Sequence, residues 1–556
     1  MQIDDLRAAP FGLDDVAIAW VLDTAAALEP AARIAQLFNI GLHGPAEGLA
    51  HRIGALQPGG ITRFFSEDGA AEAGLLDDLQ ERSAVPLLVS ADLEGSRMSL
   101  AFGTGVPNPL ALAAGDDPDT TRKISRIMAD EATAIGVNWS FTPVLDINAA
   151  FRSPIVATRG YGSDPATIRR HALAQLEVFQ ANGIAACVKH WPGEGYDDRD
   201  QHLVTTINPL DMEAWEASFG VLYRAAIDAG VLSVMSAHIA LPAFVRELDP
   251  DAGIEAARPA SLSRVLNEGL LRDRLGFNGL IVSDASEMAG VTSWMEAAAA
   301  KVEILRAGCD MVLFTDDLAR DVANVQAAVA DGTLSQARLE AALLRVLGLK
   351  AALGLHRRTK AAPIADRLAR LNAPEACETA QAAYAAAPTL VKDVNGLFPI
   401  TPERQRRVLF ASTGIVSPLH GAPTPFALPD MMRARGFEVT EFAAGTPFDP
   451  TGFDLVLYAF GEETLLTRGR IFLDWLGLTG DFRYAMKRPW HQVPTAMVSF
   501  GYPYYLYDAP RVPAYVNAYA TTEEMQAATL DCMTGAAPFR GRSPVDPFCG
   551  LEDARF

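Results

Sequence analysis

Short apolar segments recur along the first 350 residues, and several of them end abruptly in Asp, Lys or His. The segments are 37–42, 59–65, 85–92, 137–146, 184–189, 231–238, 280–284 and 311–316. Parallel strands are buried on both faces, so they are apolar throughout and become polar only at their ends. Polar residues at the carboxyl ends of many consecutive strands are typical of a (β/α)8 TIM-type barrel, whose active site lies on that face.

The segments between these strands have helical periodicity. Residues 165–182, 211–229 and 262–275 each have a polar start and a glycine just beyond the end, at Gly183, Gly230 and Gly276. About eight strand candidates alternating with such helices fit one barrel. We therefore expect an α/β fold with a TIM-type barrel over residues 1–355.

The pattern changes after the barrel. Residues 356–395 read as a linker, and residues 396–556 alternate short strands with helices again. Strands are expected at 408–412, 438–442, 455–460, 495–500 and 514–519. This pattern predicts a smaller C-terminal α/β sandwich domain. No Gly-x-Gly-x-x-Gly or Walker motif accompanies it, so we expect no nucleotide and no other cofactor.

The net charge limits the classes of partner that the protein can bind, and the cysteines indicate the compartment in which it works. The net charge of −21 disfavours nucleic acid and anionic membranes as partners. Five cysteines without CxxC spacing indicate free thiols in a reducing compartment. No signal-peptide pattern begins the chain, and no apolar run is long enough to span a bilayer. We expect a cytoplasmic monomer or homodimer.

The loop after segment 184–188 has an unusual density of titratable groups. It begins with Lys189 and His190 and reaches Asp200 and His202. A carboxylate beside an imidazole orients the ring and favours its cationic form, as a general acid near neutral pH requires. A solvated loop that merely contains a histidine is the alternative. Calcium-loop or paired-histidine spacing is missing from residues 197–202, so we expect no metal.

Asp284 ends the apolar segment 280–283. A carboxylate at the end of a strand is held by the sheet and can serve as nucleophile or base. A helix N-cap is the alternative interpretation. Asp92 also ends a strand, and Arg159 lies in a Gly-rich segment, so Asp92, Arg159 and Lys189 could grip the hydroxyls of a sugar. His238 could be a pocket residue or a packed one.

Together these stretches resemble glycoside hydrolase family 3, in its β-N-acetylglucosaminidase branch. Residues 189–195 are similar to the family's Lys-His-Phe-Pro-Gly-His-Gly motif, and residues 200–202 to its Asp-Ser-His dyad. Residues 281–284 resemble the strand that carries its nucleophile. Residues 92–97 look like Asp-x-Glu-Gly-Gly-Arg, and residues 159–162 like Arg-Ser-Phe-Gly. Residues 498–501 and 538–545 are similar to the second domain of many members.

The resemblance implies a retaining, exo-acting hydrolase that releases terminal β-linked N-acetylglucosamine. Asp284 would form a glycosyl-enzyme intermediate, and His202, held by Asp200, would act as acid and then as base. The sugar ligands would be Asp92, Arg159, Lys189 and His190. Because an imidazole repels anions less than a carboxylate does, phosphate could replace water as the acceptor.

Some residues depart from the family pattern. Glu194 replaces a histidine, Trp191 a phenylalanine and Ser96 a glycine, and Leu100 stands where a sugar-binding arginine is expected. The natural substrate could therefore differ from peptidoglycan fragments. Five alternatives remain open, since a fold does not determine a function. They are a β-glucosidase, a β-xylosidase, an N-acetylglucosaminide phosphorylase, a metal-dependent barrel hydrolase and a non-catalytic sugar-binding protein.

Overall fold

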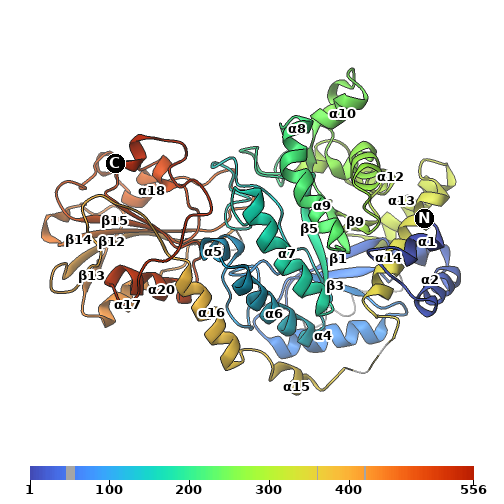
Figure 1. Ribbon diagram of the computed structural model, residues 1–556, viewed down its shortest axis with the longest axis horizontal. Coiled ribbons are helices and arrows are strands. Elements are labelled where there is room, and N and C mark those ends of the chain that lie inside the picture. Colours follow the sequence, from blue (N-terminus) through green and yellow to red (C-terminus); the bar gives the residue numbers. More distant parts are fainter. Residues whose placement is uncertain (46–56, 358, 360, 419–420) are drawn as a thin grey trace.

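Eight parallel strands close into a barrel in the first lobe of the computed structural model, as the sequence predicts (Figure 1). The structure describes residues 1–45, 57–357, 359, 361–418 and 421–556. The barrel order is β1, β10, β9, β7, β5, β4, β3, β2, and each neighbouring pair is parallel. The strands are β1 (Phe38–Leu42), β2 (Gly60–Arg63), β3 (Leu88–Ala91), β4 (Trp139–Ser140), β5 (Ala185–Trp191), β7 (Ser233–Ser236), β9 (Leu280–Ala285) and β10 (Met311–Leu313).

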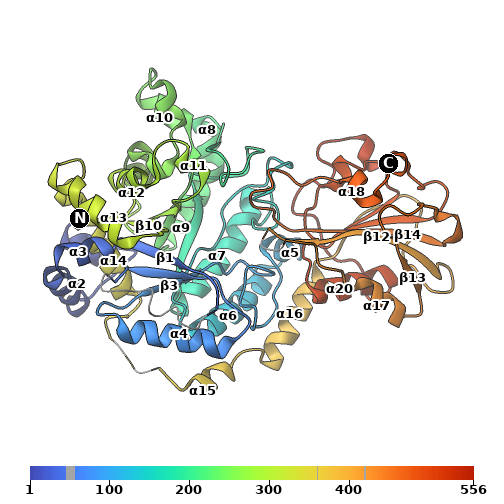
Figure 2. The same cartoon turned by 180° about the vertical axis from the view of Figure 1, so that it is seen from behind.

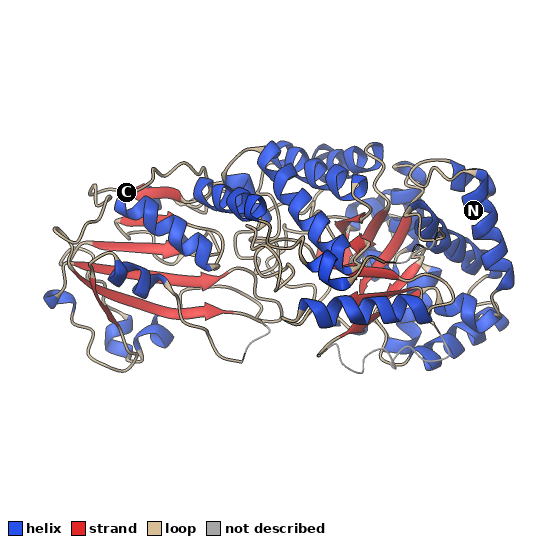
Figure 3. Ribbon diagram, turned by 90° about the horizontal axis from the view of Figure 1, so that it is seen from below, coloured by secondary structure: helices blue, strands red, loops and turns tan. Residues whose placement is uncertain are grey.

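Helices surround the strands and bury their outer faces, so strands such as β5 are buried at every position (Figure 3). The larger helices of this lobe are α2 (Asp15–Ala27), α4 (Gly69–Arg82), α6 (Pro118–Ile135), α7 (Pro165–Ala181), α9 (Val221–Asp228), α12 (Ala297–Arg306), α13 (Leu318–Ala330) and α14 (Gln336–Ala352). Shorter ones are α1 (Ile3–Arg7), α3 (Pro30–Ala35), α5 (Pro109–Ala114), α8 (Met212–Trp215), α10 (Pro242–Leu248) and α11 (Ala289–Thr292). Two strands outside the barrel, β6 (Thr206–Ile207) and β8 (Ile239–Ala240), pair with each other.

Three predicted elements differ in detail. The helix expected at 211–229 is divided by a π-helical turn at Glu216–Gly220, and the one expected at 262–275 is π-helical over Val265–Arg274. The strand expected at 137–146 is regular only in β4, because Pro143 cannot donate to a ladder. Beyond it the chain still follows β5, since Leu145 N donates to Lys189 O at 2.7 Å.

The second lobe is an α/β sandwich around one six-stranded sheet. Helix α18 (Trp475–Thr479) lies on one face, and α17 (Leu428–Ala434) and α20 (Glu523–Thr534) lie on the other (Figure 1). A further short helix is α19 (Phe482–Ala485). The sheet order is β11 (Thr389–Asp393), β16 (Ala514–Asn517), β15 (Thr495–Ser499), β14 (Leu455–Glu462), β12 (Arg407–Val416) and β13 (Glu438–Glu441), with only the β11–β16 pair antiparallel among these strands.

The segment between the lobes is more ordered than an extended linker. It contains α15 (Ile364–Leu368) and α16 (Pro374–Ala386), although residues 358 and 360 lie outside the described part. Helix α16 packs against α6 of the barrel and α20 of the second lobe (Figure 2). Strand β11, within the stretch expected to be a linker, forms the edge of the second sheet. No helix in the described ranges is long and apolar enough to cross a membrane.

A buried charge network closes the amino-terminal end of the barrel. Asp310, fully buried just before β10, lies 2.6 Å from Arg272 and also pairs with Arg338 and, at 3.7 Å, Arg345. Its carboxylate also accepts from Ile281 N at 2.9 Å. Burial raises the pKa of Asp310, but the three guanidinium groups outweigh burial and lower it.

We expect Asp310→Asn to lower the free energy of unfolding by about 3–5 kcal/mol, because it leaves largely buried arginines without their counter-charge. Urea unfolding of the variant measures this change. Asp15→Asn is the control, since Asp15 is mostly exposed and pairs with exposed Arg7, so loss of this charge should change little. Equal stabilities of the two variants would contradict a structural role for the network.

Candidate active site

The carboxyl ends of the barrel strands surround one pocket of about 270 Å³. Asp92 follows β3, Lys189 and His190 lie in β5, and Asp284 lies in β9. Six of the seven residues predicted from sequence line this pocket: Asp92, Arg159, Lys189, His190, His202 and Asp284. The seventh, Asp200, lies behind His202 and contacts it.

Alternating charges form one wall of the pocket. Lys189 Nζ lies 2.7 Å from Asp92 Oδ1 and 2.8 Å from Glu94 Oε1, and Arg159 binds both oxygens of Glu94 at 2.9 Å. Burial raises the pKa of Glu94, but Arg159 and Lys189 outweigh it and hold that pKa far below its usual range. The Asp92 side chain is 21% exposed and that of Lys189 only 2%. Asp92 is therefore the member best placed to meet a ligand.

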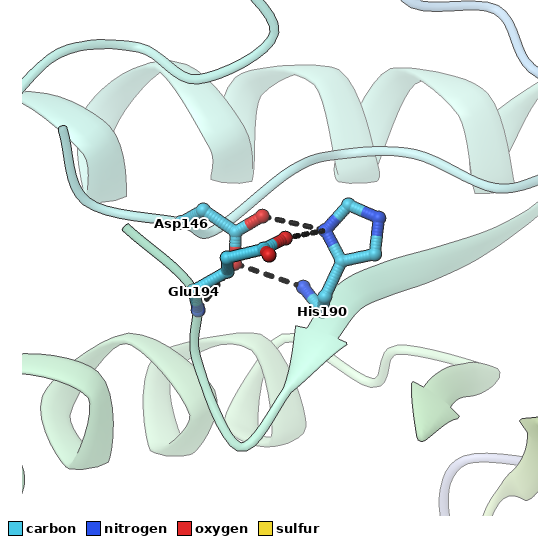
Figure 4. Close-up of side chains that lie close together, drawn as sticks. All are labelled: Asp146, His190 and Glu194. Atoms are coloured by element: carbon cyan, nitrogen blue, oxygen red, sulfur yellow. Dashed lines mark hydrogen bonds and ion pairs between the residues drawn. The ribbon is translucent and has the colours of Figure 1, made fainter. Parts of the chain in front are cut away.

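His190 is oriented by a carboxylate that the sequence analysis did not single out as functional. Asp146 Oδ2 lies 2.5 Å from His190 Nδ1, while Asp146 Oδ1 accepts from the backbone N–H groups of His190 and Glu194, each at 3.0 Å (Figure 4). Asp146 ends the apolar segment 137–146, so the rule that selected Asp92 and Asp284 could have found it. The ring of His190 is thus fixed at the pocket edge.

Glu194, the residue that departs from the family motif, lies beside this pair (Figure 4). Gln201 Nε2 donates to Glu194 Oε2 at 3.0 Å, and Gln201 Oε1 accepts from His238 N at 3.0 Å. Burial and then the charge of Asp146 raise the pKa of Glu194 well above its ordinary value, which favours its neutral form. Through Gln201, Glu194 therefore supports the loop that carries His202.

Asp146, His190 and Glu194 have the residue types of a metal site, since one ligand atom from each lies within 4.8 Å of the others. The 2.5 Å contact between His190 Nδ1 and Asp146 Oδ2 is a hydrogen bond that leaves no room for an ion between these atoms. Backbone donors occupy the other oxygen of Asp146. The geometry is that of a hydrogen-bonded network.

Asp200 and His202, the predicted acid/base dyad, contact each other. Asp200 Oδ1 lies 2.7 Å from His202 Nδ1 and accepts from His202 N at 2.8 Å. Burial raises the pKa of Asp200, but hydrogen bonds and the charge of His202 outweigh it and lower that pKa. With Nδ1 held by Asp200, Nε2 is the ring nitrogen left for the pocket.

Asp284 is held as an anion. Burial raises its pKa, but His190, His238 and His202 outweigh burial and lower it. The following helix α11 has Met288 as its N-cap and no side-chain cap, so the N-cap interpretation of Asp284 is wrong. His238 is a packed residue, because Nδ1 contacts Ser261 Oγ at 2.8 Å and Nε2 contacts Ala285 O at 2.9 Å.

The second lobe completes the pocket wall with residues that sequence reasoning missed: Ser417, Pro418, Glu463, Thr464 and Leu466. These lie far from the barrel motifs in sequence, and no local pattern points to them. Glu463 is a saturated acceptor. Its Oε1 accepts from Ser96 Oγ at 2.8 Å and from Thr521 N and Oγ1 at 2.9 and 2.7 Å, and its Oε2 from Asn108 at 3.2 Å.

The chain is similar to proteins of known family and structure. Residues 32–349 match the model of the glycosyl hydrolase family 3 N-terminal domain. A protein of Cellulomonas fimi named β-N-acetylglucosaminidase/β-glucosidase is 40% identical over 99% of both chains. A solved β-glucoside phosphorylase, BglX, is 32% identical over the whole of both chains with a TM-score of 0.92. A family 3 β-N-acetylglucosaminidase from Paenibacillus sp. str. FPU-7 is 25% identical, with a TM-score of 0.80 over 94% of this chain and all of that one. The chain is therefore a glycoside hydrolase that belongs to family 3.

Proposed function

We propose that this enzyme is a retaining, exo-acting β-N-acetylglucosaminidase. We base this on one half-buried carboxylate with a lowered pKa, Asp284, and a carboxylate-held imidazole, His202, which line the same pocket. Asp92, Arg159, Lys189 and His190 would bind the terminal sugar. The name of the Cellulomonas fimi relative, which includes both N-acetylglucosaminidase and glucosidase, supports this substrate class.

The proposed reaction has two steps. Asp284 attacks the anomeric carbon while His202 Nε2 donates a proton to the leaving oxygen, so the glycosidic bond breaks and a glycosyl-enzyme ester forms. Neutral His202 then takes a proton from water, which attacks the same carbon and releases Asp284. An imidazole can perform both roles near neutral pH, because its ordinary pKa lies there.

The carboxylates of the second lobe are poorer candidates for the acid. Glu463 lines the pocket, but both of its carboxylate oxygens already accept hydrogen bonds from donors of the protein. Burial raises the pKa of neighbouring Glu462 to about 7, a suitable value for an acid. Glu462, however, does not line the pocket and is hydrogen bonded to buried Tyr505. The dyad is therefore the better assignment.

We expect Asp284→Asn to abolish turnover of nitrophenyl β-N-acetylglucosaminide, because it removes the nucleophile. His202→Ala should lower kcat/KM by about 10²–10⁴-fold for substrates whose leaving group needs protonation. Steady-state assays, run on the glucoside and xyloside as well, measure both effects. Asp198→Asn is the matched control, an exposed carboxylate in the same loop. Full activity of Asp284→Asn would contradict the assignment.

A second candidate, phosphorolysis, is favoured by the similarity to β-glucoside phosphorylase BglX. Phosphate would then attack the glycosyl-enzyme in place of water, release Asp284 and give a sugar 1-phosphate. A neutral imidazole permits the approach of this anion, whereas a carboxylate in the place of His202 would repel it.

Incubation of the enzyme and substrate with and without phosphate distinguishes phosphorolysis from hydrolysis. If phosphorolysis is the reaction, turnover should rise with phosphate concentration, sugar 1-phosphate should appear, and His202→Glu should lose this dependence. Chromatography of the products provides the measurement. Unchanged turnover with free sugar as the product at every phosphate concentration would leave hydrolysis as the reaction.

A further inference from the structure

A short segment of the second lobe reaches over the barrel mouth. Residues 463–467, here termed the bridging segment, come directly after β14. Glu463 Oε1 accepts from Ser96 Oγ at 2.8 Å, and Leu465 N donates to Pro154 O at 3.2 Å. Thr464 Oγ1 lies 3.2 Å from Thr158 Oγ1, next to Arg159 in sequence. Consecutive residues of the bridging segment are thus fixed to barrel loops.

The last residue of the bridging segment contacts the dyad. Thr467 N donates to Asp200 Oδ2 at 2.8 Å, while Asp200 Oδ1 accepts from both His202 Nδ1 and His202 N. The two oxygens of Asp200 thus have different partners, one in each lobe. With both oxygens engaged, the plane of the carboxylate is fixed, and so is the ring of His202.

The hydrogen bond from Thr467 N is important because its acceptor, Asp200, is buried. Asp200 is only 1% exposed, so bulk water has little access to Oδ2 if the Thr467 N–H moves away. Thr467 also has φ of 64°, an uncommon conformation for a β-branched residue. Such conformations persist where surrounding contacts determine them and are concentrated at functional sites.

We infer that Thr467 is a positioning residue for the acid/base group, so that the active site is incomplete without the second lobe. This inference rests on the proposed roles of Asp200 and His202. A purely structural contact between lobes would leave the proton transfer itself unaffected. A positioning role and a purely structural role therefore predict that a Thr467 variant affects different substrates.

The test uses the dependence of kcat/KM on the leaving group. An alkyl β-N-acetylglucosaminide needs a proton on its leaving oxygen, whereas a dinitrophenyl one leaves without help. Replacing Thr467 by its α-hydroxy acid analogue turns the amide into an ester and removes only the N–H. Thr467→Pro also removes it, but proline cannot adopt this φ. Thr467→Ala and Thr467→Gly keep the N–H and serve as matched controls.

We expect the ester variant to lose about 10–100-fold in kcat/KM on the alkyl substrate, as for a lost hydrogen bond to a charged group. Its kcat/KM on the dinitrophenyl substrate should stay within about twofold of wild type. External azide should accelerate breakdown of its glycosyl-enzyme and give a glycosyl azide. The alanine and glycine controls should behave like wild type on both substrates.

Equal losses on both substrates, or no loss on either, would overturn the positioning role. His202→Ala serves as the reference, because it should show the same selective loss in larger measure. If wild type is active but His202→Ala lacks this selectivity, the dyad assignment fails and the inference about Thr467 fails with it. If His202→Ala shows it and the ester variant does not, only the inference about Thr467 is wrong.

Discussion

The buried ion pairs of Lys189 hold the ends of two barrel strands together, and the rest of the site is arranged around them. An ammonium group that is almost fully buried needs close counter-charges, and Asp92 and Glu94 supply them at 2.7 and 2.8 Å. Glu94 in turn binds Arg159, so β3, β5 and the Gly-rich segment after Asp146 converge. The most exposed carboxylate, Asp92, is then presented to the pocket.

In the rest of the pocket, carboxylates lie next to imidazoles. Asp146 faces His190, and Asp200 faces His202, while the three imidazoles near Asp284 favour its anionic form. One more negative charge here would oppose both an anionic nucleophile and an anionic acceptor. The raised pKa of Glu194 disfavours that charge. Glu194 thus stands where the family motif has a histidine. It accepts a hydrogen bond from Gln201, and its raised pKa favours its neutral form.

Much of the barrel could be predicted because its signals are local. Asp92, Lys189 and Asp284 each end an apolar segment, and a barrel brings such ends to one face. Asp146 ends the apolar segment 137–146 in the same way, so the same rule applies to it. The contributions of Glu463, Thr464 and Thr467 could not be predicted, because they depend on how two separately patterned lobes dock. Edge strand β11 was missed because a short segment after a helix gives little periodicity.

The proposed mechanism requires that Asp284 becomes covalently linked to the sugar. A fluorinated N-acetylglucosaminyl fluoride should form the glycosyl-enzyme quickly and release it slowly, so the adduct accumulates. Mass spectrometry of the intact protein and of its peptides measures this directly. We expect one sugar per chain, attached to the peptide that contains Asp284 and missing from Asp284→Asn. An adduct on Glu463, or turnover that proceeds without any adduct in the wild type, would contradict it.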